Sequence, residues 1–272
     1  MNLTVRDVTI DVVQRSLDDF QHPGIRDLPL ALTHGILRVV TADGLEGNCI
    51  IGEYWGRPEA YFAPLMDVLK PELMGRCATE REWLWDRHNQ LHKRFKLTDP
   101  VWAAVDIALW DIAGKAAGLP VYKLLGAQRE AVKAYATYPW ACTKADQFVA
   151  EADDALSRGF TAYKIHPGLT DTRETCRMAH KVRKRVGEDV ALMLDPNCGY
   201  DYRKALEVGR ALDDTGFHWF EDPVSYTDLE AISELSRRLE TPLCMTDQAP
   251  QQFFTAADFI RRGALRMVRG TA

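Results

Sequence analysis

Short apolar runs alternate with helical stretches through the second half of the chain, and this alternation constrains the fold more than any other feature. Five helical stretches separate six such runs, which are AVKAYATY, TAYKIHP, VALMLDP, FHWFEDP, PLCMTDQ and LRMVRG. Strand, helix, strand order predicts a parallel sheet with helices outside it. A closed barrel of this type contains more strands. The pattern over residues 128–272 therefore predicts part of a (β/α) barrel, and the protein is expected to be of the α/β class.

Three acidic residues close three successive apolar runs at equal spacing. Glu221 follows Asp195 by 26 residues, and Asp247 follows Glu221 by the same interval. A strand with its return helix takes about 25–30 residues. We therefore expect the three carboxylates at the same edge of the sheet, where (β/α) barrels carry their active sites.

Converging carboxylates repel one another unless a cation lies between them, and a divalent metal ion is the expected cation. Carboxylate oxygens are hard ligands that favour Mg²⁺, or Mn²⁺ as an alternative, over zinc. Mg²⁺ usually keeps coordination positions for water and substrate. The sequence thus predicts a Mg²⁺ site built from Asp195, Glu221 and Asp247.

Two further functional groups precede this triad by one strand. Lys164 and His166 are two residues apart, so they point to the same side of an extended strand. A lysine, a histidine and a metal ion suit removal of the proton next to a carboxylate, with the metal and lysine stabilising the enediolate. His166 is expected to take the proton with almost no adjustment of its pKa, although the nearby Lys164 should lower that pKa somewhat. Asn197 is expected to share the orientation of Asp195 and to bind the substrate carboxylate.

Other interpretations of these residues remain open. A single acid after a strand is more often a helix N-cap than a metal ligand, and a lone lysine can be an extended surface side chain. His88 and His92 stand four apart on a predicted helix, but their charged neighbours indicate a solvated face.

The first half of the chain has a different pattern. Residues 1–52 predict a meander of strands, with a hairpin turn at Asp43-Gly44. From about residue 58 to 126 the pattern is helical, and Gly118 followed by Pro120 predicts the end of one helix. Trp102 and Trp110 are expected in the core. The change of pattern near 126–128 predicts an α+β domain over residues 1–127.

Composition excludes several classes of function. The net charge is −5, so no basic field indicates nucleic-acid binding. No apolar run has the length of a membrane span, and no signal-like start is present, so we expect a cytoplasmic protein that does not contact membranes. The six cysteines are scattered, which is typical of reduced thiols and not of a disulfide framework.

Taken together, the motifs resemble those of the enolase superfamily, in its mandelate racemase and muconate lactonising branch. The resemblance is carried by TADGLEG (41–47), VDIALWDIAGKAAGLPVYKLLGA (105–127), YKIHPG (163–168), LDPNCGY (194–200), FEDP (220–223) and TDQ (246–248). It implies an N-terminal α+β capping domain followed by a modified TIM barrel. It also implies Mg²⁺ on Asp195, Glu221 and Asp247, with His166 of the Lys164-x-His166 pair as the base.

The chain departs from the family pattern in three places. The second lysine of the family's Lys-x-Lys pair is His166 here. Thr271 stands near the Asp that usually ends the sixth barrel strand, with Arg269 close by. The last barrel strands are not accounted for, so we expect a C-terminally truncated enzyme. One-base chemistry through His166 is expected, whereas two-base racemisation is not supported by these residues.

In this family, loops of the capping domain select the substrate. Here those loops would be Asp18–Leu30 and Asn48–Arg57, and Tyr138 and Trp140 would line the floor of the same pocket. The loops offer cationic and hydrogen-bonding groups suited to a polyhydroxylated acid. The predicted substrate ligands are Asn197, His22, Arg26, Tyr54, Trp55 and Tyr138.

Three functions follow from these observations. The leading hypothesis is Mg²⁺-dependent dehydration of a sugar acid to a 2-keto-3-deoxy acid. The second is racemisation or epimerisation of a 2-hydroxy acid or an amino acid derivative. The third is an inactive fragment or pseudo-enzyme retained as an assembly subunit. In each enzyme hypothesis the substrate is a small carboxylic acid, and we expect a homo-oligomer.

Overall fold

The structure is a computed structural model that describes residues 1–16, 31–52, 58–138, 142–168, 171–245 and 252–270. The chain divides into two compact units, with described residues up to Ala131 in the first and from Val132 onward in the second. Each unit has its own hydrophobic core. The boundary between residues 127 and 128 stays a prediction about where one domain ends.

An antiparallel sheet forms one layer of the first unit. Its strands are β1 (Val5–Ser16), β2 (Ala31–Thr41) and β3 (Glu46–Ile51), in the order β1-β2-β3. Gly44 has a φ of +82° in the turn between β2 and β3, a conformation that favours glycine. The hairpin predicted at Asp43-Gly44 is therefore confirmed.

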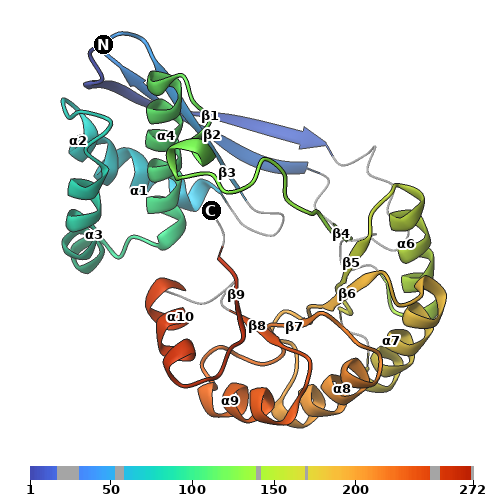
Figure 1. The fold of residues 1–272 in the computed structure, drawn as a ribbon. Helices are drawn as coiled ribbons and strands as arrows, with labels where there is room; N and C mark the ends of the chain where they lie inside the picture. The colour runs from blue at the N-terminus through green and yellow to red at the C-terminus, as the bar shows by residue number, and fades with distance from the viewer. Residues whose placement is uncertain (17–30, 53–57, 139–141, 169–170, 246–251, 271–272) are drawn as a thin grey trace. The chain divides into compact units, whose positions relative to one another are not determined.

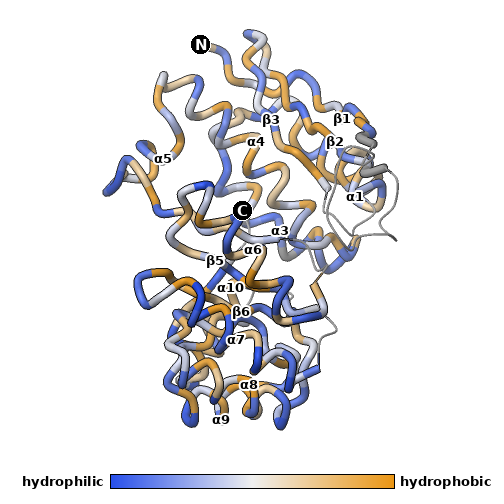
Figure 2. Tube along the Cα trace, turned by 90° about the vertical axis from the view of Figure 1, so that its right-hand side faces the viewer, coloured by the Kyte–Doolittle hydropathy of each residue, from blue (hydrophilic) through white to orange (hydrophobic). Residues whose placement is uncertain are grey.

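Helices form the other layer of this unit. They are α1 (Glu59–Pro64), the π-helical turn η1 (Leu65–Leu69), α2 (Lys70–Leu73), α3 (Arg81–Phe95), α4 (Asp99–Ala117) and α5 (Val121–Leu124). Apolar residues run along α4, as Figure 2 shows, and its buried face includes Val105, Ala108 and Ile112.

Close packing of α4 on the sheet depends on one glycine. A Cβ atom at Gly47 would lie 2.0 Å from the carbonyl oxygen of Ala108, a distance that no side chain can occupy. At the far end of α4, Gly118 adopts a φ of 65° as its C-cap, as the sequence predicts. Trp102 is buried, as expected, while Trp110 is only partly buried.

The second unit is built on a six-stranded parallel sheet. Its strands are β4 (Ala136–Thr137), β5 (Ala162–Ile165), β6 (Ala191–Leu194), β7 (Trp219–Glu221), β8 (Leu243–Met245) and β9 (Met267–Val268). They pair in sequence order, each parallel to the next. The predicted α/β class and the partial barrel of six strands are confirmed in the part of the chain that the structure describes.

Five helices follow the strands and lie on the outer side of the curved sheet (Figure 1). They are α6 (Ala145–Ser157), α7 (Thr172–Val186), α8 (Tyr202–Asp214), α9 (Leu229–Arg238) and α10 (Gln252–Arg261). Alternate strand residues such as Tyr163, Ile165 and Leu194 belong to the core beneath these helices. The residues between them, such as Lys164, therefore point to the inner side of the sheet.

Helix capping separates structural acids from the acids of the predicted site. The side chains of Asp171, Asp201 and Asp228 accept hydrogen bonds from backbone N–H groups in the first turns of α7, α8 and α9. Asp195 and Glu221 make no such contact with these helices. The N-cap interpretation therefore does not apply to either residue.

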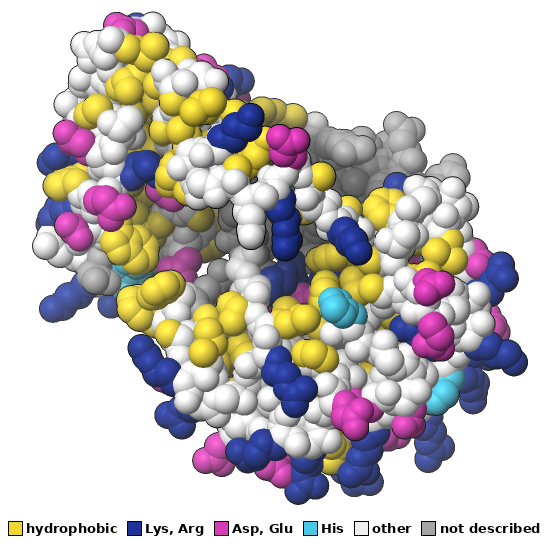
Figure 3. Space-filling model, in the orientation of Figure 1, with side chains coloured by type: hydrophobic (Ala, Val, Ile, Leu, Met, Phe, Trp, Pro, Cys, Tyr) yellow, Lys and Arg dark blue, Asp and Glu magenta, His cyan; other side chains and the backbone are white. Residues whose placement is uncertain are grey.

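Charged side chains of both signs are interspersed on the face of the protein shown in Figure 3. All six cysteines are free thiols. In the residues that the structure describes, no helix combines the length and the apolar character that a membrane crossing demands.

Arg183 of α7 ties together the loops at the opposite edge of the sheet, where strands begin. The side chain is 8% exposed. Its guanidinium donates to the carbonyl oxygens of Gly187 (2.7 Å), Val190 (2.8 Å), Thr215 (2.8 Å) and Gly216 (3.0 Å). One side chain thus satisfies four acceptors that would otherwise lose their partners.

Arg183→Met should lower the free energy of unfolding by about 3 kcal/mol, since buried carbonyl groups lose charged donors. Chemical denaturation monitored by circular dichroism measures the change. Arg185→Met is the matched control, because Arg185 lies on the same helix in an exposed ion pair with Asp153 and should have little effect. Equal stability of the two variants would contradict the role given to Arg183.

Candidate active site

A buried ammonium group joins two buried carboxylates at the carboxyl edge of the parallel sheet. The Nζ atom of Lys164 donates to Oδ2 of Asp195 at 2.8 Å and to Oε1 of Glu221 at 3.1 Å. The exposed fractions of the three residues are 3%, 5% and 0%. Removal from water strengthens this ion pairing, because the surrounding protein screens charge less than water does.

The register of three strands brings these groups together. Ile165 of β5 pairs with Leu194 of β6, and Leu194 pairs with Phe220 of β7. Asp195 directly follows β6, and Glu221 is the last residue of β7. The two carboxylates therefore meet at one edge, as their spacing in the sequence predicts.

Three more groups contact these carboxylates. The backbone N–H of Asn197 donates to Oδ1 of Asp195 at 2.9 Å. The indole N–H of Trp219 donates to Oε2 of Glu221 at 2.9 Å, and the guanidinium of Arg269 forms an ion pair with Oε1 of the same residue. Sequence reasoning missed the contact of Trp219, although its position two residues before Glu221 places both on the same side of β7.

Left-handed backbone conformations shape the turns after β6 and β7. Asn197, Cys198 and Asp222 have φ values of 50°, 59° and 36°, which are uncommon for residues with a side chain. The turns are tied together, since the N–H of Cys198 donates to the carbonyl of Asp222 at 2.6 Å. Such strain often accompanies functional sites.

The turn changes what the sequence predicts for Asn197. Strand alternation predicts that Asn197 shares the orientation of Asp195, but β6 ends at Leu194 and Asn197 adopts the left-handed conformation, so strand alternation does not extend to Asn197. Its side chain is exposed. Its role as a ligand of the substrate carboxylate stays a prediction.

His166 lies beside Asp195 with a defined hydrogen bond. Its Nδ1 atom is 3.1 Å from the carbonyl oxygen of Asp195. That oxygen can only accept, so Nδ1 carries the proton and Nε2 carries the lone pair. Burial, followed by the positive charge of Lys164, lowers the pKa of His166 to about 4. The lowering by Lys164 agrees in direction with the prediction from the sequence, whereas the larger effect of burial is not revealed by the sequence.

The carboxylates of Asp195 and Glu221 keep Lys164 protonated. Burial alone would lower the pKa of Lys164, but the carboxylates of Asp195 and Glu221 outweigh burial and raise it above its ordinary value. The ring of Tyr135 lies 5.9 Å from Nζ. Lys164 is thus a cation at neutral pH, which excludes it as a proton acceptor in this state.

The predicted metal ligands are only partly described. Asp195 and Glu221 supply oxygen donors of the kind that Mg²⁺ prefers, and Asp247 lies outside the described residues. Among the described residues, no group of three His, Cys, Asp or Glu side chains is arranged to hold a metal ion. The donor chemistry fits Mg²⁺, and the assignment of all three ligands stays a prediction.

The predicted substrate residues have different outcomes. His22, Arg26, Tyr54 and Trp55 lie outside the described residues, as do Trp140 and Thr271. The hydroxyl of Tyr138 donates to Asp154 of α6, while its ring contacts Tyr163. Tyr138 therefore has a packing role, and its contact with a substrate stays a prediction.

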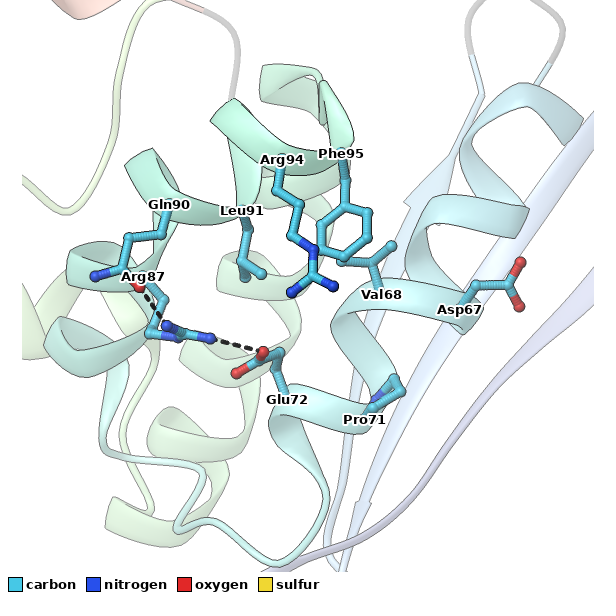
Figure 4. A pocket seen from close by; sticks show the side chains of 9 residues that line it. All are labelled: Asp67, Val68, Pro71, Glu72, Arg87, Gln90, Leu91, Arg94 and Phe95. Atoms are coloured by element: carbon cyan, nitrogen blue, oxygen red, sulfur yellow. Dashed lines mark hydrogen bonds and ion pairs between the residues drawn. The ribbon is translucent and has the colours of Figure 1, made fainter.

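The first unit has a cavity and a histidine pair of its own. A cavity of about 270 Å³ lies between η1, α2 and α3, where Arg87 contacts Glu72 and Gln90 (Figure 4). It contains none of the predicted catalytic residues.

His92 contacts the carbonyl oxygen of Leu97 at 2.6 Å, and His88 packs on Trp102. These contacts give the histidines of α3 a packing role, where the sequence indicates a solvated face.

In metal-free protein, the imidazole of His166 should titrate near pH 4 in NMR spectra. Stability should fall as the pH drops from about 6.5 to about 4, because the unfolded chain takes up a proton that folded His166 does not. Lys164→Met should raise this midpoint, since it removes a neighbouring positive charge. A midpoint near 6.5 in the unaltered protein would contradict the described environment.

Family models match both parts of the chain. The N-terminal domain of mandelate racemase / muconate lactonizing enzyme matches residues 31–126, and the enolase C-terminal domain-like model matches residues 147–271.

Curated relatives include enzymes of different reaction types. Arabinonate dehydratase of Saccharolobus solfataricus is 32% identical over 227 residues, which cover 81% of this chain and 60% of that protein. N-succinyl-L-Arg/Lys racemase of Bacillus cereus is 28% identical over 75% of this chain and 54% of that protein. The chain thus spans little more than half the length of these relatives.

Solved structures agree with this assignment. D-glucarate dehydratase from Agrobacterium tumefaciens, complexed with magnesium, has a TM-score of 0.84 and 29% identity, covering 99% of this chain and 74% of that one. The capping domain and the barrel-like parallel sheet are therefore shared with known enzymes. The chain belongs to the enolase superfamily, with the N-terminal domain of the mandelate racemase and muconate lactonizing enzymes.

Proposed function

We propose that this site removes the proton next to the carboxylate of a small acid, with a divalent metal ion as cofactor. The observation that carries the proposal is the buried ammonium of Lys164 between the carboxylates of Asp195 and Glu221. Three strands have to end in register to create this arrangement. Relatives that include dehydratases and racemases support the same class of chemistry.

Asp195, Glu221 and Asp247 would hold Mg²⁺, with Mn²⁺ as an alternative. When bound, the metal supplies positive charge that stabilises an enediolate. The magnesium in the D-glucarate dehydratase structure supports this cofactor. The hard oxygen donors of Asp195 and Glu221 support it independently.

Lys164 would stabilise the negative charge that develops on the substrate carboxylate. Its partners keep it protonated, and its buried position limits competition from water. A cation held in place before the reaction stabilises charge without further reorganisation. This role needs the ammonium and not a free amine.

His166 would accept the α-proton at Nε2. The hydrogen bond from Nδ1 to the carbonyl oxygen of Asp195 sets the tautomer. The lowered pKa keeps the ring neutral and able to accept a proton across the neutral range. A weak base of this kind depends on strong stabilisation of the product charge, which Lys164 and the metal would provide.

The preferred reaction is dehydration of a sugar acid to a 2-keto-3-deoxy acid. After the α-proton moves to His166, the β-hydroxyl would leave as water with a proton returned by the protonated imidazole or by solvent, and the enol product then becomes the keto acid. Relatives named arabinonate dehydratase, L-talarate/galactarate dehydratase and D-gluconate/D-galactonate dehydratase support this substrate class. The predicted loop ligands His22, Arg26, Tyr54 and Trp55, together with Asn197 and Tyr138, remain part of the proposal.

Racemisation or epimerisation is the second candidate. It is favoured by the similarity to N-succinyl-L-Arg/Lys racemase and L-Ala-D/L-Glu epimerase. The difference between the two reactions lies in the fate of the β-hydroxyl. Exchange of the α-proton with solvent deuterium, without loss of water, would identify this second reaction.

The assembly and location of the protein remain predictions. We propose a homo-oligomer, which analytical ultracentrifugation can test. The free cysteines are compatible with the reducing cytoplasm.

Asp195→Asn and Glu221→Gln should each weaken Mg²⁺ binding by about tenfold or more, because a charged oxygen ligand is lost. Isothermal titration calorimetry gives the dissociation constants. Asp201→Asn is the control, since Asp201 caps α8 and asparagine is also a good cap. Unchanged affinity in both site variants would remove Asp195 and Glu221 from the metal site.

His166→Ala should abolish exchange of the α-proton in D₂O while leaving Mg²⁺ affinity unchanged. The assay combines a library of sugar acids with NMR detection of exchange and colorimetric detection of 2-keto acids. The unaltered protein should release a 2-keto acid from at least one member. Loss of metal affinity together with exchange would mean that His166 is not the base, and inactivity of the metal-loaded protein on all members would oppose dehydration.

A further inference from the structure

Trp219 makes a hydrogen bond to one of the two buried carboxylates of the candidate site. Its indole N–H donates to Oε2 of Glu221 at 2.9 Å. Both residues belong to β7 and are two positions apart, so strand alternation directs both side chains to the inner side of the sheet. Glu221 is fully buried, so this donor replaces a hydrogen bond that water would otherwise make.

The bond restricts the direction of the Glu221 carboxylate. The terminal torsion of a glutamate side chain has broad, nearly two-fold preferences, so the side chain alone does not fix the plane of its carboxylate. In Glu221, Lys164 donates to Oε1 at 3.1 Å and Arg269 pairs with the same oxygen, whereas Trp219 donates to Oε2. Donors on both oxygens determine the rotation of the carboxylate. The indole N–H carries no charge, so it orients the carboxylate without neutralising it.

Tyr135 supports the indole ring of Trp219. The two rings pack edge to face, with centroids 5.7 Å apart and planes at 77°, which is a preferred arrangement of aromatic pairs. Tyr135 directly precedes β4, so this contact crosses the inner side of the sheet past β5 and β6. The ring of Tyr135 also lies 5.9 Å from Nζ of Lys164, within the range of a cation–π interaction. The aromatic pair therefore contacts both the ammonium and a carboxylate of the site.

Packing of the hydrophobic core does not account for this aromatic pair. Tyr135 and Trp219 are only partly buried. Neither residue belongs to the core of the second unit or to the partly buried side chains packed against that core. Their contacts with Lys164 and Glu221 instead connect them to the candidate site.

We propose that Trp219 is a positioning residue, whose indole N–H directs the Glu221 carboxylate and thereby the ammonium of Lys164. This inference rests on the proposed function, in which Lys164 stabilises the charge that develops on the substrate carboxylate. An ammonium held in place before the reaction favours the transition state more than the bound substrate. Loss of the N–H should therefore slow proton removal more than it weakens substrate binding.

Two variants remove the N–H group. Trp219→Phe keeps an aromatic ring, and replacement of Trp219 by 3-benzothienylalanine, whose sulfur takes the place of the N–H, also keeps the shape of the indole. Tyr163→Phe is the matched control, because the hydroxyl of buried Tyr163 also donates to a carboxylate, that of Glu151, on the outer side of the same sheet.

Crystal structures of the unaltered protein and the variants measure the effect on geometry directly. In both Trp219 variants, the Glu221 carboxylate should rotate or adopt several conformations, and Nζ of Lys164 should move out of hydrogen-bonding range of Oε1. Tyr163→Phe should leave both groups unchanged. An unchanged arrangement of Glu221 and Lys164 in both Trp219 variants would overturn the role of Trp219, whether or not the protein is active.

The kinetic measurement uses the sugar acid that the unaltered protein converts fastest in the library, with Mg²⁺ present. Both Trp219 variants should lower kcat for α-proton exchange by about 10- to 100-fold, a range typical of lost outer-shell partners, while KM changes less. Tyr163→Phe should lower the melting temperature and leave kcat close to its original value.

The outcomes separate this inference from the proposed function. Equal kcat values for the unaltered protein and both Trp219 variants would overturn the role of Trp219 and leave the proposed function intact. An equal fall of kcat in Tyr163→Phe would also overturn that role, because it would show that any lost buried donor has the same effect. Inactivity of the unaltered protein toward every acid would overturn the proposed function together with the kinetic role of Trp219, even where the crystal structures show that Trp219 directs Glu221.

Discussion

The pairing of one buried ammonium with two buried carboxylates is the interaction on which the rest of the candidate site depends. An unpaired carboxylate in the interior costs several kcal/mol, about the size of a large mutational effect. Lys164 removes this cost for both Asp195 and Glu221. The pairing requires three strands in register and turns that leave the sheet abruptly, which explains the left-handed residues after β6 and β7.

Much of the architecture could be predicted from the sequence. The six apolar runs became six parallel strands, because run length and alternation with helices are local properties. The interval of 26 residues between Asp195 and Glu221 predicted that both lie at the same edge of the sheet, because the lengths of strand and helix determine where each strand ends. Asp247 completes this spacing but lies outside the described residues, so its position remains a prediction.

Contacts that depend on side-chain direction and burial could not be predicted in the same way. The sequence predicts only a small lowering of the pKa of His166 by Lys164, but burial together with Lys164 lowers that pKa to about 4. Asn197 leaves the strand geometry because β6 ends before it. The motifs mark the region of Arg269 as unusual, yet only the fold brings its guanidinium to Glu221. Each of these effects arises from tertiary packing.

Membership of the enolase superfamily suggests a chemical role for this arrangement, and we propose that the carboxylates joined by Lys164 form the metal site. A crystal structure of the chain with Mg²⁺ and a sugar acid tests that claim most directly. We expect a metal ion bound by oxygens of Asp195 and Glu221, with the substrate carboxylate near Lys164 and His166. A metal ion bound elsewhere, with Lys164 still bridging the same two carboxylates, would contradict it.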